Sequence, residues 1–181
     1  MRKHWLTGAL VLLGTVAVTT LAPAQTTSNG PYYATPSWDQ QLPAATRFIV
    51  LSNWNSEAVL DRETGLVWQR TPTTDMTSWS GALRFCHSLS LGNRVGWRLP
   101  ALEELASLQD PTQKNPALPA GHPFQLTATE FWVATAGEGS PSFAYVADVN
   151  VAGFAALVVK NGSLTFPYWC VRGGAGVSSP Q

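Results

Sequence analysis

Only two cysteines occur in the chain, Cys86 and Cys170, and 84 positions separate them. In an exported protein, two distant cysteines are typical of one disulfide, which would tie together segments that are far apart in the sequence. In the chain-entropy model, a closure of this length stabilises a fold by roughly 4–5 kcal/mol. The other reading, which the cysteines alone leave open, is a pair of free thiols. The choice depends on whether the chain is exported.

The N-terminal residues have the pattern of an export signal. Arg2 and Lys3 give a basic start, an apolar run follows, and the letters APA at 22–24 have the small-x-small form of a cleavage site. We therefore predict a signal peptide over 1–24 and a secreted or extracytoplasmic protein, in the periplasm or at the cell surface. No second apolar run of about 20 residues follows, so we expect no membrane span after signal removal.

Composition divides the remaining residues into three parts. Residues 25–46 are rich in Thr, Ser and Pro and are predicted as a flexible segment. Residues 47–174 have a length that suits one ordinary domain, and 175–181 form a tail. Removal of the signal leaves nine basic residues against eleven acidic ones, a net charge near −2. Because nucleic-acid binders usually carry a basic surplus, we expect no nucleic-acid partner.

Turn and capping residues place the first elements of the domain. Gly65 closes a turn between two apolar runs, so 57–70 is predicted to form a hairpin. A helix follows, with Thr77 or Ser78 as its N-cap. Its apolar residues recur at helical spacing and form one inward face: Trp79, Ala82, Leu83 and Cys86. Cys86 therefore points inward, where a second cysteine could reach it.

The stretch GWRLPALEEL at 96–105 ends in two adjacent acids, Glu103 and Glu104. They admit two readings, an acid/base dyad or the start of a helix. Pro100 suits the first turn of a helix, where its missing N–H is not needed, and the helix dipole stabilises acids near that end. Neighbours on a helix point about 100° apart, so the two carboxylates do not easily serve one site. We predict a helix start, with one of the acids available to pair with Arg98.

The C-terminal half combines a long loop with strands. Residues 110–128 carry four prolines and are predicted as a loop. Four segments rich in apolar, β-branched or aromatic residues follow, FWVATA, FAYVADV, FAALVVK and LTFPYWCVR. Asn161-Gly162 is a strong hairpin turn between the last two. The predicted fold class is α+β, with two helices, long loops and an antiparallel sheet whose final meander ends at Cys170.

Few residues carry the marks of catalysis or metal binding. The sequence holds no nucleophile elbow and no P-loop, and with both cysteines bridged, His87 and His122 lack further ligands for zinc. Asp148 and Asn150 offer oxygen ligands, but no dense calcium loop surrounds them. We expect no catalytic residue, no metal site and no cofactor. The alternative is an enzyme with convergent acids, drawn from a set such as Asp110, Glu130 and Asp148.

Aromatic residues are the most prominent remaining feature. Tryptophan stacks on sugar rings and anchors protein interfaces, but it also fills cores. Spacing favours a core position for Trp68, Trp79, Trp97, Trp132 and Trp169. Trp38 and Trp54 follow no such spacing and are freer to contact a ligand.

Six sequence blocks occur in a fixed order. They are AVLDRETGLVWQR, the helix that carries Cys86, GWRLPALEELASL, NPALPAGHPF, FWVATA and YWCVRGG. In this order they resemble the Lcl C-terminal domain family, a bacterial domain of unknown function whose members carry D-x-x-TGL-x-WQR, GWRLPT-x-EEL and a closing WCVR. The resemblance covers about residues 48–174.

This resemblance implies a C-type-lectin-like fold, related to the formylglycine-generating enzyme domain. In that fold a disulfide joins the first helix to the last strand, which fits Cys86 and Cys170. The resemblance also implies a non-catalytic, adhesin-like module, because the family's named member belongs to an adhesin that recognises sulfated glycans. The reactive cysteine pair of the formylglycine-generating enzymes has no counterpart here, since Cys170 is the only cysteine near the C-terminus. An enzyme of that fold is therefore the less favoured reading.

The resemblance places a binding surface on the loops and strands before the closing cysteine, about 136–168. We predict that it recognises a glycan or a surface protein, through Tyr145, Asp148, Asn150, Phe154, Lys160 and Asn161. The chain departs from the family in WVAT at 132–135 and in a more apolar stretch at 151–166, so a protein-binding face is as plausible as a glycan-binding one. A structural component of the cell envelope is a third reading, and the oligomeric state is left open.

Overall fold

The computed structural model describes residues 42–174. The predicted signal peptide, nearly all of the predicted flexible segment, the tail and Trp38 lie outside the described residues. Among residues 42–174, no helix has the length and apolar character that crossing a bilayer requires.

The described elements are mostly short, with the helices in the first two thirds of the chain and four consecutive strands at its end. In chain order they are α1 (Ala44–Arg47), β1 (Phe48–Val50), the 3-10 turn η1 (Ser52–Trp54), β2 (Ala58–Asp61), β3 (Val67–Gln69), α2 (Trp79–Ser88), β4 (Trp97–Arg98), α3 (Leu102–Ala106), β5 (Glu130–Ala136), β6 (Phe143–Asp148), β7 (Ala155–Val159) and β8 (Val171–Arg172). The predicted α+β class is confirmed, with antiparallel pairing between the named strands and one disulfide. The predicted hairpin over 57–70 is β2 and β3, and the proline-rich stretch 110–128 contains no helix or strand.

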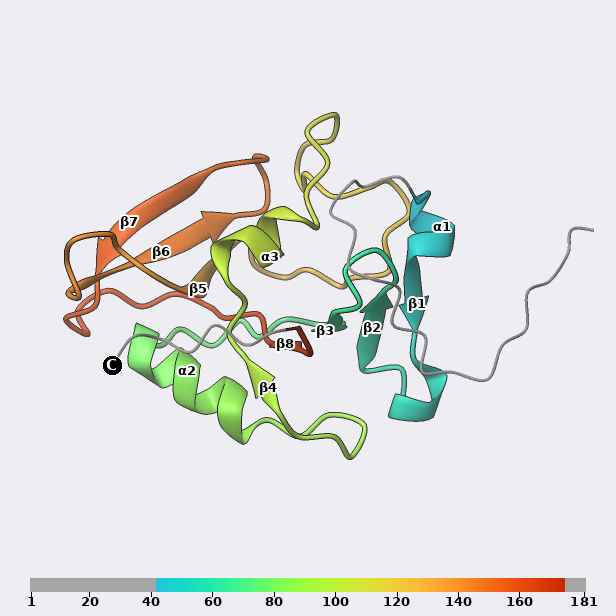
Figure 1. The fold of residues 1–181 in the computed structure, drawn as a ribbon, viewed down its shortest axis with the longest axis horizontal. Helices are drawn as coiled ribbons and strands as arrows, with labels where there is room; N and C mark the ends of the chain where they lie inside the picture. Colours follow the sequence, from blue (N-terminus) through green and yellow to red (C-terminus); the bar gives the residue numbers. More distant parts are fainter. Residues whose placement is uncertain (1–41, 175–181) are drawn as a thin grey trace, which may run out of the picture. The chain divides into compact units, whose positions relative to one another are not determined.

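The strands form two sheets rather than one (Figure 1). The five-stranded sheet has the order β1-β2-β3-β8-β4, so the last strand of the chain lies between strands that come much earlier. Arg172 in β8 pairs with Val67 on one side and with Trp97 on the other. The three-stranded sheet, β5-β6-β7, is built from consecutive strands.

The predicted hairpin at Asn161-Gly162 is wrong, and so is the meander that was to end at Cys170. Among the described residues, β7 pairs with β6 alone, and β8 belongs to the other sheet. The Asn161 side chain accepts hydrogen bonds from the backbone N–H and the hydroxyl of Ser163, at 3.1 and 2.6 Å, which forms a local turn without a returning strand. The chain then reaches Trp169, which is fully buried and donates its indole N–H to the carbonyl of Gln69 in β3. Burial of this indole draws the last segment into the five-stranded sheet.

The helix α2 forms as its sequence predicts. Ser78 is the N-cap and its hydroxyl accepts a hydrogen bond from the N–H of Gly81 at 3.3 Å. On the inward face, Ala82 and Cys86 are fully buried. Cys86 is bonded to Cys170, with the two Cα atoms 5.5 Å apart, so the predicted disulfide is confirmed and the free-thiol reading is wrong.

Glu103 and Glu104 lie in the first turn of α3, where only one of them is buried. Glu103 is exposed, whereas Glu104 is buried and accepts two hydrogen bonds from Arg98, at 2.7 and 2.6 Å. Glu104 also accepts the backbone N–H of Ala101 at 2.8 Å, which satisfies one of the donors left over at a helix start. The helix-start reading and the pairing with Arg98 are confirmed. The helix begins at Leu102 rather than at Pro100, whose carbonyl is occupied by the N–H of Ala134.

Two clusters of apolar side chains form the core. One surrounds Trp68 and Trp169, whose rings meet edge to face at 5.3 Å, between the five-stranded sheet, α3 and β5. The other surrounds Trp97, Trp132 and the disulfide, beneath α2. The predicted core position is confirmed for these four tryptophans, which are at most 1% exposed. Trp79 is half-buried and packs against the second cluster, with its indole N–H donated to the carbonyl of Val133.

Candidate functional site

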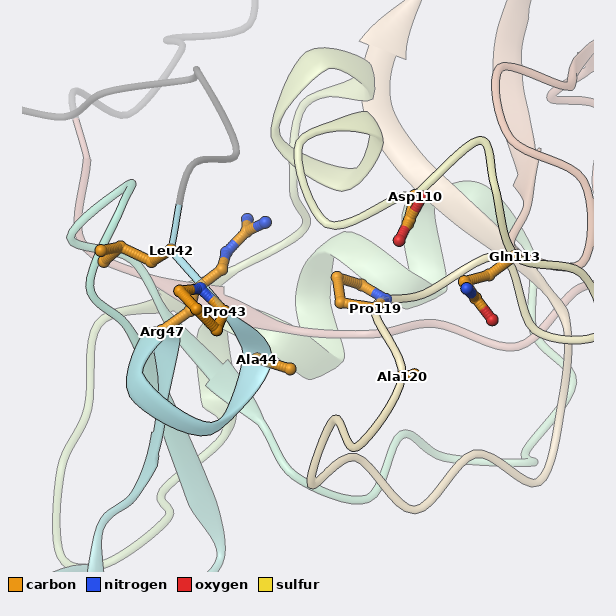
Figure 2. A pocket seen from close by; sticks show the side chains of 8 residues that line it. All are labelled: Leu42, Pro43, Ala44, Arg47, Asp110, Gln113, Pro119 and Ala120. Carbon is orange, nitrogen blue, oxygen red and sulfur yellow. The ribbon is translucent and has the colours of Figure 1, made fainter.

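A hollow of about 300 Å³ lies between α1 and the proline-rich loop, with Arg47 on one side and Asp110 and Gln113 on the other (Figure 2). The Arg47 guanidinium is committed to the fold. It donates two hydrogen bonds to Asp61, at 2.9 and 2.8 Å, and one to the carbonyl of Ser107 at 2.8 Å, and it lies 3.3 Å from a Glu63 oxygen. These side chains are nearly inaccessible to solvent, so this arginine stabilises the fold and does not offer its charge to a ligand.

Asp110, which lines the same hollow, uses its carboxylate to stabilise the loop. The hydroxyl and the backbone N–H of Thr112 donate hydrogen bonds to its carboxylate, at 2.7 and 2.8 Å. These bonds hold the pKa of Asp110 below its ordinary value of 3.8. A carboxylate stabilised in this way is a weak general base at neutral pH.

Glu130 and Asp148, the other two acids that an enzyme could use, lie close to each other. Glu130 in β5 and Asp148 in β6 are paired opposite each other across the two strands. Asp148 accepts the N–H of Asn150 at 2.7 Å, which fixes the turn after β6, and Glu130 is exposed. The four hollows described in this section are lined by neither Glu130 nor Asp148.

The predicted ligand-binding residues fall into separate places along β6, β7 and the turns beside them. Lys160 and Asn161 line one shallow hollow of about 220 Å³ at the end of β7. The Lys160 ammonium lies 3.9 Å from the centre of the Trp79 ring, and burial lowers the pKa of Lys160 from its ordinary value. The Asn161 carboxamide oxygen is occupied by Ser163.

Phe154 lines a second hollow, of about 260 Å³, between α3 and the turn that joins β6 to β7. Phe154 is 52% exposed, while Tyr145 is half-buried in β6. The Asn150 carbonyl accepts the N–H of Asn115, so this turn is joined to the proline-rich loop. The six predicted residues therefore share one sheet and its turns, and the structure does not bring them into one pocket.

The two described histidines, His87 and His122, lie in different surroundings. Among residues 42–174, no group of three or more His, Cys, Asp and Glu side chains is arranged to hold a metal ion. His122 packs on the ring of Phe124 at 5.9 Å, and burial lowers its pKa from the ordinary value of 6.5. His87 is exposed at the end of α2.

A different surface gathers two cationic side chains around one aromatic ring. The guanidinium carbons of Arg94 and Arg172 each lie 5.6 Å from the ring centre of Trp54, so they are at most twice that distance apart. Within residues 42–174 neither arginine forms an ion pair. We call Trp54, Arg94 and Arg172 the arginine–tryptophan surface.

The Trp54 ring is held firmly in this surface. It meets the buried Trp97 ring edge to face at 6.4 Å. Gly92 packs directly behind it, because a Cβ atom on Gly92 would lie 2.4 Å from the Cβ of Trp54. Gly92 also has a φ of 54°, a conformation that favours glycine. The close approach of Gly92 thus places the base of the Trp54 side chain, and the contact with Trp97 positions its ring.

An open hollow of about 370 Å³ continues from Arg172, with Gly96, Arg98, Gly173 and Gly174 as its other lining residues. Arg98 is paired with Glu104. Within residues 42–174, the Arg172 guanidinium donates one hydrogen bond, from Nε to the carbonyl of Val95 at 2.8 Å. Glycine at position 174 leaves room in this hollow, since a Cβ atom there would lie 3.0 Å from the Arg98 guanidinium. A flat group that carries negative charge would find cationic donors and backbone here rather than apolar side chains.

Sequence reasoning found one part of this surface and missed the rest. It identified Trp54 as a freer tryptophan, and the structure leaves Trp54 only partly buried. Arg94 and Arg172 are 78 residues apart in sequence, and only the insertion of β8 beside β4 brings both to one ring. No local pattern signals such a meeting.

Comparison with known proteins gives one family. The model of the Lcl C-terminal domain matches residues 57–172, well over half of the chain. No curated protein and no solved structure matches the chain at a significant level. The match includes both cysteines, the Arg98–Glu104 pair and Arg172. The chain therefore belongs to the Lcl C-terminal domain family.

Proposed function

We propose that this protein is a secreted or surface-exposed, non-catalytic binding module that recognises a glycan bearing acidic groups, in the manner of an adhesin. The observation that carries the proposal is the arginine–tryptophan surface, where two guanidinium groups without ion-pair partners in the described residues flank one ring. Guanidinium groups form paired hydrogen bonds with carboxylate, sulfate or phosphate oxygens. Tryptophan offers the apolar face on which sugar rings pack.

The geometry supports a preformed site rather than one built on binding. Gly92 and Trp97 fix the Trp54 ring, and Val95 holds the Nε of Arg172. A preformed site loses less side-chain entropy when a ligand binds. We also propose that the domain is related to C-type-lectin-like folds, which is supported by a disulfide from α2 to the segment next to the final strand.

The first test is a glycan array with the purified, oxidised protein, run in calcium and in chelator. We expect binding to acidic glycans, unchanged by chelator and weakened by salt, because exposed charges are screened within about 8 Å at physiological ionic strength. Binding to neutral glycans alone would contradict the assignment of the arginine–tryptophan surface. A blank array from folded protein would contradict glycan recognition itself.

Matched arginine variants locate the site. Arg94→Gln removes one guanidinium from Trp54, and we expect about tenfold weaker binding, the size of one charged hydrogen bond. The control is Arg84→Gln on α2, since Arg84 is also exposed and also lies 5.6 Å from an aromatic ring, that of Phe85. An equal loss in both variants would indicate a diffuse charge effect and would contradict a specific site.

A surface protein is the second candidate ligand, and the hollow beside Phe154 favours it. This hollow has mostly apolar walls, including Leu102, Ala147 and Ala155. The side chain of Gln109 holds its far edge in place, donating to the carbonyl of Asp148 and accepting the N–H of Gly153. Phe154→Ser would weaken capture of a protein partner and leave binding to an acidic glycan unchanged.

A further inference from the structure

The strand β7 lies at an open edge of the three-stranded sheet. Among the described residues it pairs only with β6, because the chain leaves the sheet after Val159. An edge strand presents unpaired N–H and C=O groups, and natural proteins usually protect such edges with charges, prolines or bulges. The five residues of β7, AALVV, include no charge and no proline, and their pairing with β6 is continuous. This edge is therefore suited to adding another strand.

The hydrogen bonds on either side of β7 show which backbone groups point outward. The N–H of Lys160 donates to Ser142 at 2.8 Å, and the carbonyl of Phe154 accepts from Asp148 at 3.1 Å. Because hydrogen-bonded and non-bonded residues alternate along an antiparallel strand, the even-numbered residues between them face β6. The outward groups then belong to Ala155, Leu157 and Val159, and none of their N–H or C=O groups has a partner within residues 42–174.

This arrangement is complementary to itself. If a second copy lies antiparallel with Leu157 opposite Leu157, Ala155 of each copy lies opposite Val159 of the other. Each of these three opposed pairs exchanges two backbone hydrogen bonds, so every outward donor meets an acceptor. The symmetry is a closed two-fold, the commonest symmetry of protein dimers, and it leaves no open β7 edge for further addition.

The charge distribution also suits a second copy. Of the two residues that flank β7 in sequence, Phe154 and Lys160, only Lys160 is charged, and in this register it lies opposite Phe154, which is 52% exposed. The two Lys160 side chains are six residues apart along the paired strands, about 20 Å, so their repulsion is screened. Leu157, which is 48% exposed and lies against Gly137, is covered by its counterpart.

We propose that two copies of this chain pair antiparallel through β7, about a two-fold axis at Leu157, to form one continuous six-stranded sheet. Because β7 is only five residues long, we expect the interface to bury less than the ~1,600 Å² of a standard stable complex, and we expect the dimer to dissociate in the micromolar range. A dimer would present two arginine–tryptophan surfaces, which would increase the strength of attachment to a repeating glycan. The dimer itself does not depend on that glycan function.

Sedimentation velocity over a range of protein concentration tests the proposal. We expect the untreated protein to shift from monomer to dimer, and Leu157→Lys to remain a monomer, because two ammonium groups would meet on the two-fold axis. The control is Val95→Lys, since Val95 is apolar and 68% exposed but lies in the turn before β4, away from β7. Near-ultraviolet circular dichroism of the buried tryptophans shows that each variant is folded.

A charge-rescue experiment makes the register itself falsifiable. Leu157→Glu alone should also be monomeric, whereas an equal mixture of Leu157→Lys and Leu157→Glu should dimerise again through opposite charges on the axis. Leu157→Pro provides a backbone test, because proline is tolerated on an edge strand where its missing N–H faces solvent, and it should abolish the dimer without unfolding the sheet. A protein that is monomeric at every concentration, or a dimer that Leu157→Lys leaves intact, would overturn the proposal. A dimer without glycan binding would contradict only the proposed function.

Discussion

The two sheets of this domain are assembled from strands at very different sequence distances. The three-stranded sheet uses consecutive strands between residues 130 and 159, joined by short turns. The five-stranded sheet joins β3 to β8, with Trp68 paired to Val171, more than 100 positions later. Loop closure over such a distance costs conformational entropy before any contact forms.

The stabilising interactions are concentrated where that entropic cost is largest. The disulfide holds Cys170, which immediately precedes β8, to α2. The buried Arg47–Asp61 pair joins α1 to the end of β2, and Arg98 joins β4 to α3 and to the carbonyl of Gly173 after β8. The three-stranded sheet has no disulfide and no salt bridge among the described residues, and one of its edges is open. Covalent and ionic links thus accompany the non-local sheet, while hydrogen bonds and apolar contacts suffice for the local one.

Removal of the Cys86–Cys170 disulfide should have the largest effect on the stability of the fold. The double variant Cys86→Ala/Cys170→Ala should lower the free energy of unfolding by roughly 4–5 kcal/mol, the chain-entropy value for this loop. Urea unfolding measures this loss, and hydrogen exchange locates it. Amides of Val171 and Trp68 should lose protection more than those of Val146. Equal loss in both sheets would show that the two sheets open as one unit.

Loss of the buried ion pairs of Arg47 should have the second-largest effect on stability. Arg47→Met leaves the carboxylates of Asp61 and Glu63 buried without their cation and should cost roughly 3–5 kcal/mol. The control is Arg62→Met, because Arg62 is exposed in the same hairpin and a surface change of this kind is usually worth less than about 0.5 kcal/mol. Similar urea midpoints for the two variants would refute the structural role of Arg47.

The adjacent acids of α3 offer a comparison within one turn of helix. Glu104→Gln loses the charge that Arg98 pairs with and weakens the bond to the Ala101 N–H, so we expect a loss of about 2 kcal/mol. Glu103→Gln should change stability by less than about 0.5 kcal/mol, since its side chain is exposed. Thermal unfolding of the two variants side by side measures the difference, and a larger loss for Glu103→Gln would contradict the assignment.

The smallest effect is a pH dependence from His122. Burial lowers the pKa of His122, and its buried Nδ1 has no hydrogen-bond partner among the described residues. The unfolded chain therefore binds the proton more tightly, so stability is greatest above pH 6.5 and falls as the pH drops through 6.5 toward the folded-state pKa.

Urea midpoints at about pH 7.5 and about pH 5.5 measure this slope. His122→Gln should flatten it, and His87→Gln, at an exposed histidine, should not. If both variants behaved like the unmodified protein, carboxylates alone would explain the acid sensitivity.

Local features of the fold were predictable because their causes lie within a few residues. Ser78 caps α2 through a bond to Gly81, and Asp61 and Thr64 bond within the turn that ends at Gly65. Helical spacing placed Ala82 and Cys86 on the inward face. The blocks AVLDRETGLVWQR and GWRLPALEELASL contain Asp61, Arg98 and Glu104, which form buried or half-buried ion pairs in the structure.

Non-local features could not be deduced in this way. Asn161-Gly162 is a good local turn, yet no strand of the described part of the chain returns beside β7, because burial of Trp169 against Trp68 favours the other sheet. The same insertion of β8 brings Arg172 to Trp54 and completes the arginine–tryptophan surface.

The sequence by itself determined α2, α3, the hairpin over 57–70 and the family, since each depends on local hydrogen bonds, on spacing or on an ordered set of motifs. It predicted the disulfide once export was assumed, because the chain has only two cysteines. The tertiary structure alone decided which sheet receives the last strand, which of two adjacent acids is buried, which arginines share a ring and which strand edge stays open. Those outcomes depend on the arrangement that buries the most apolar surface while leaving every buried charge paired, a condition on the whole domain that no short stretch of sequence contains.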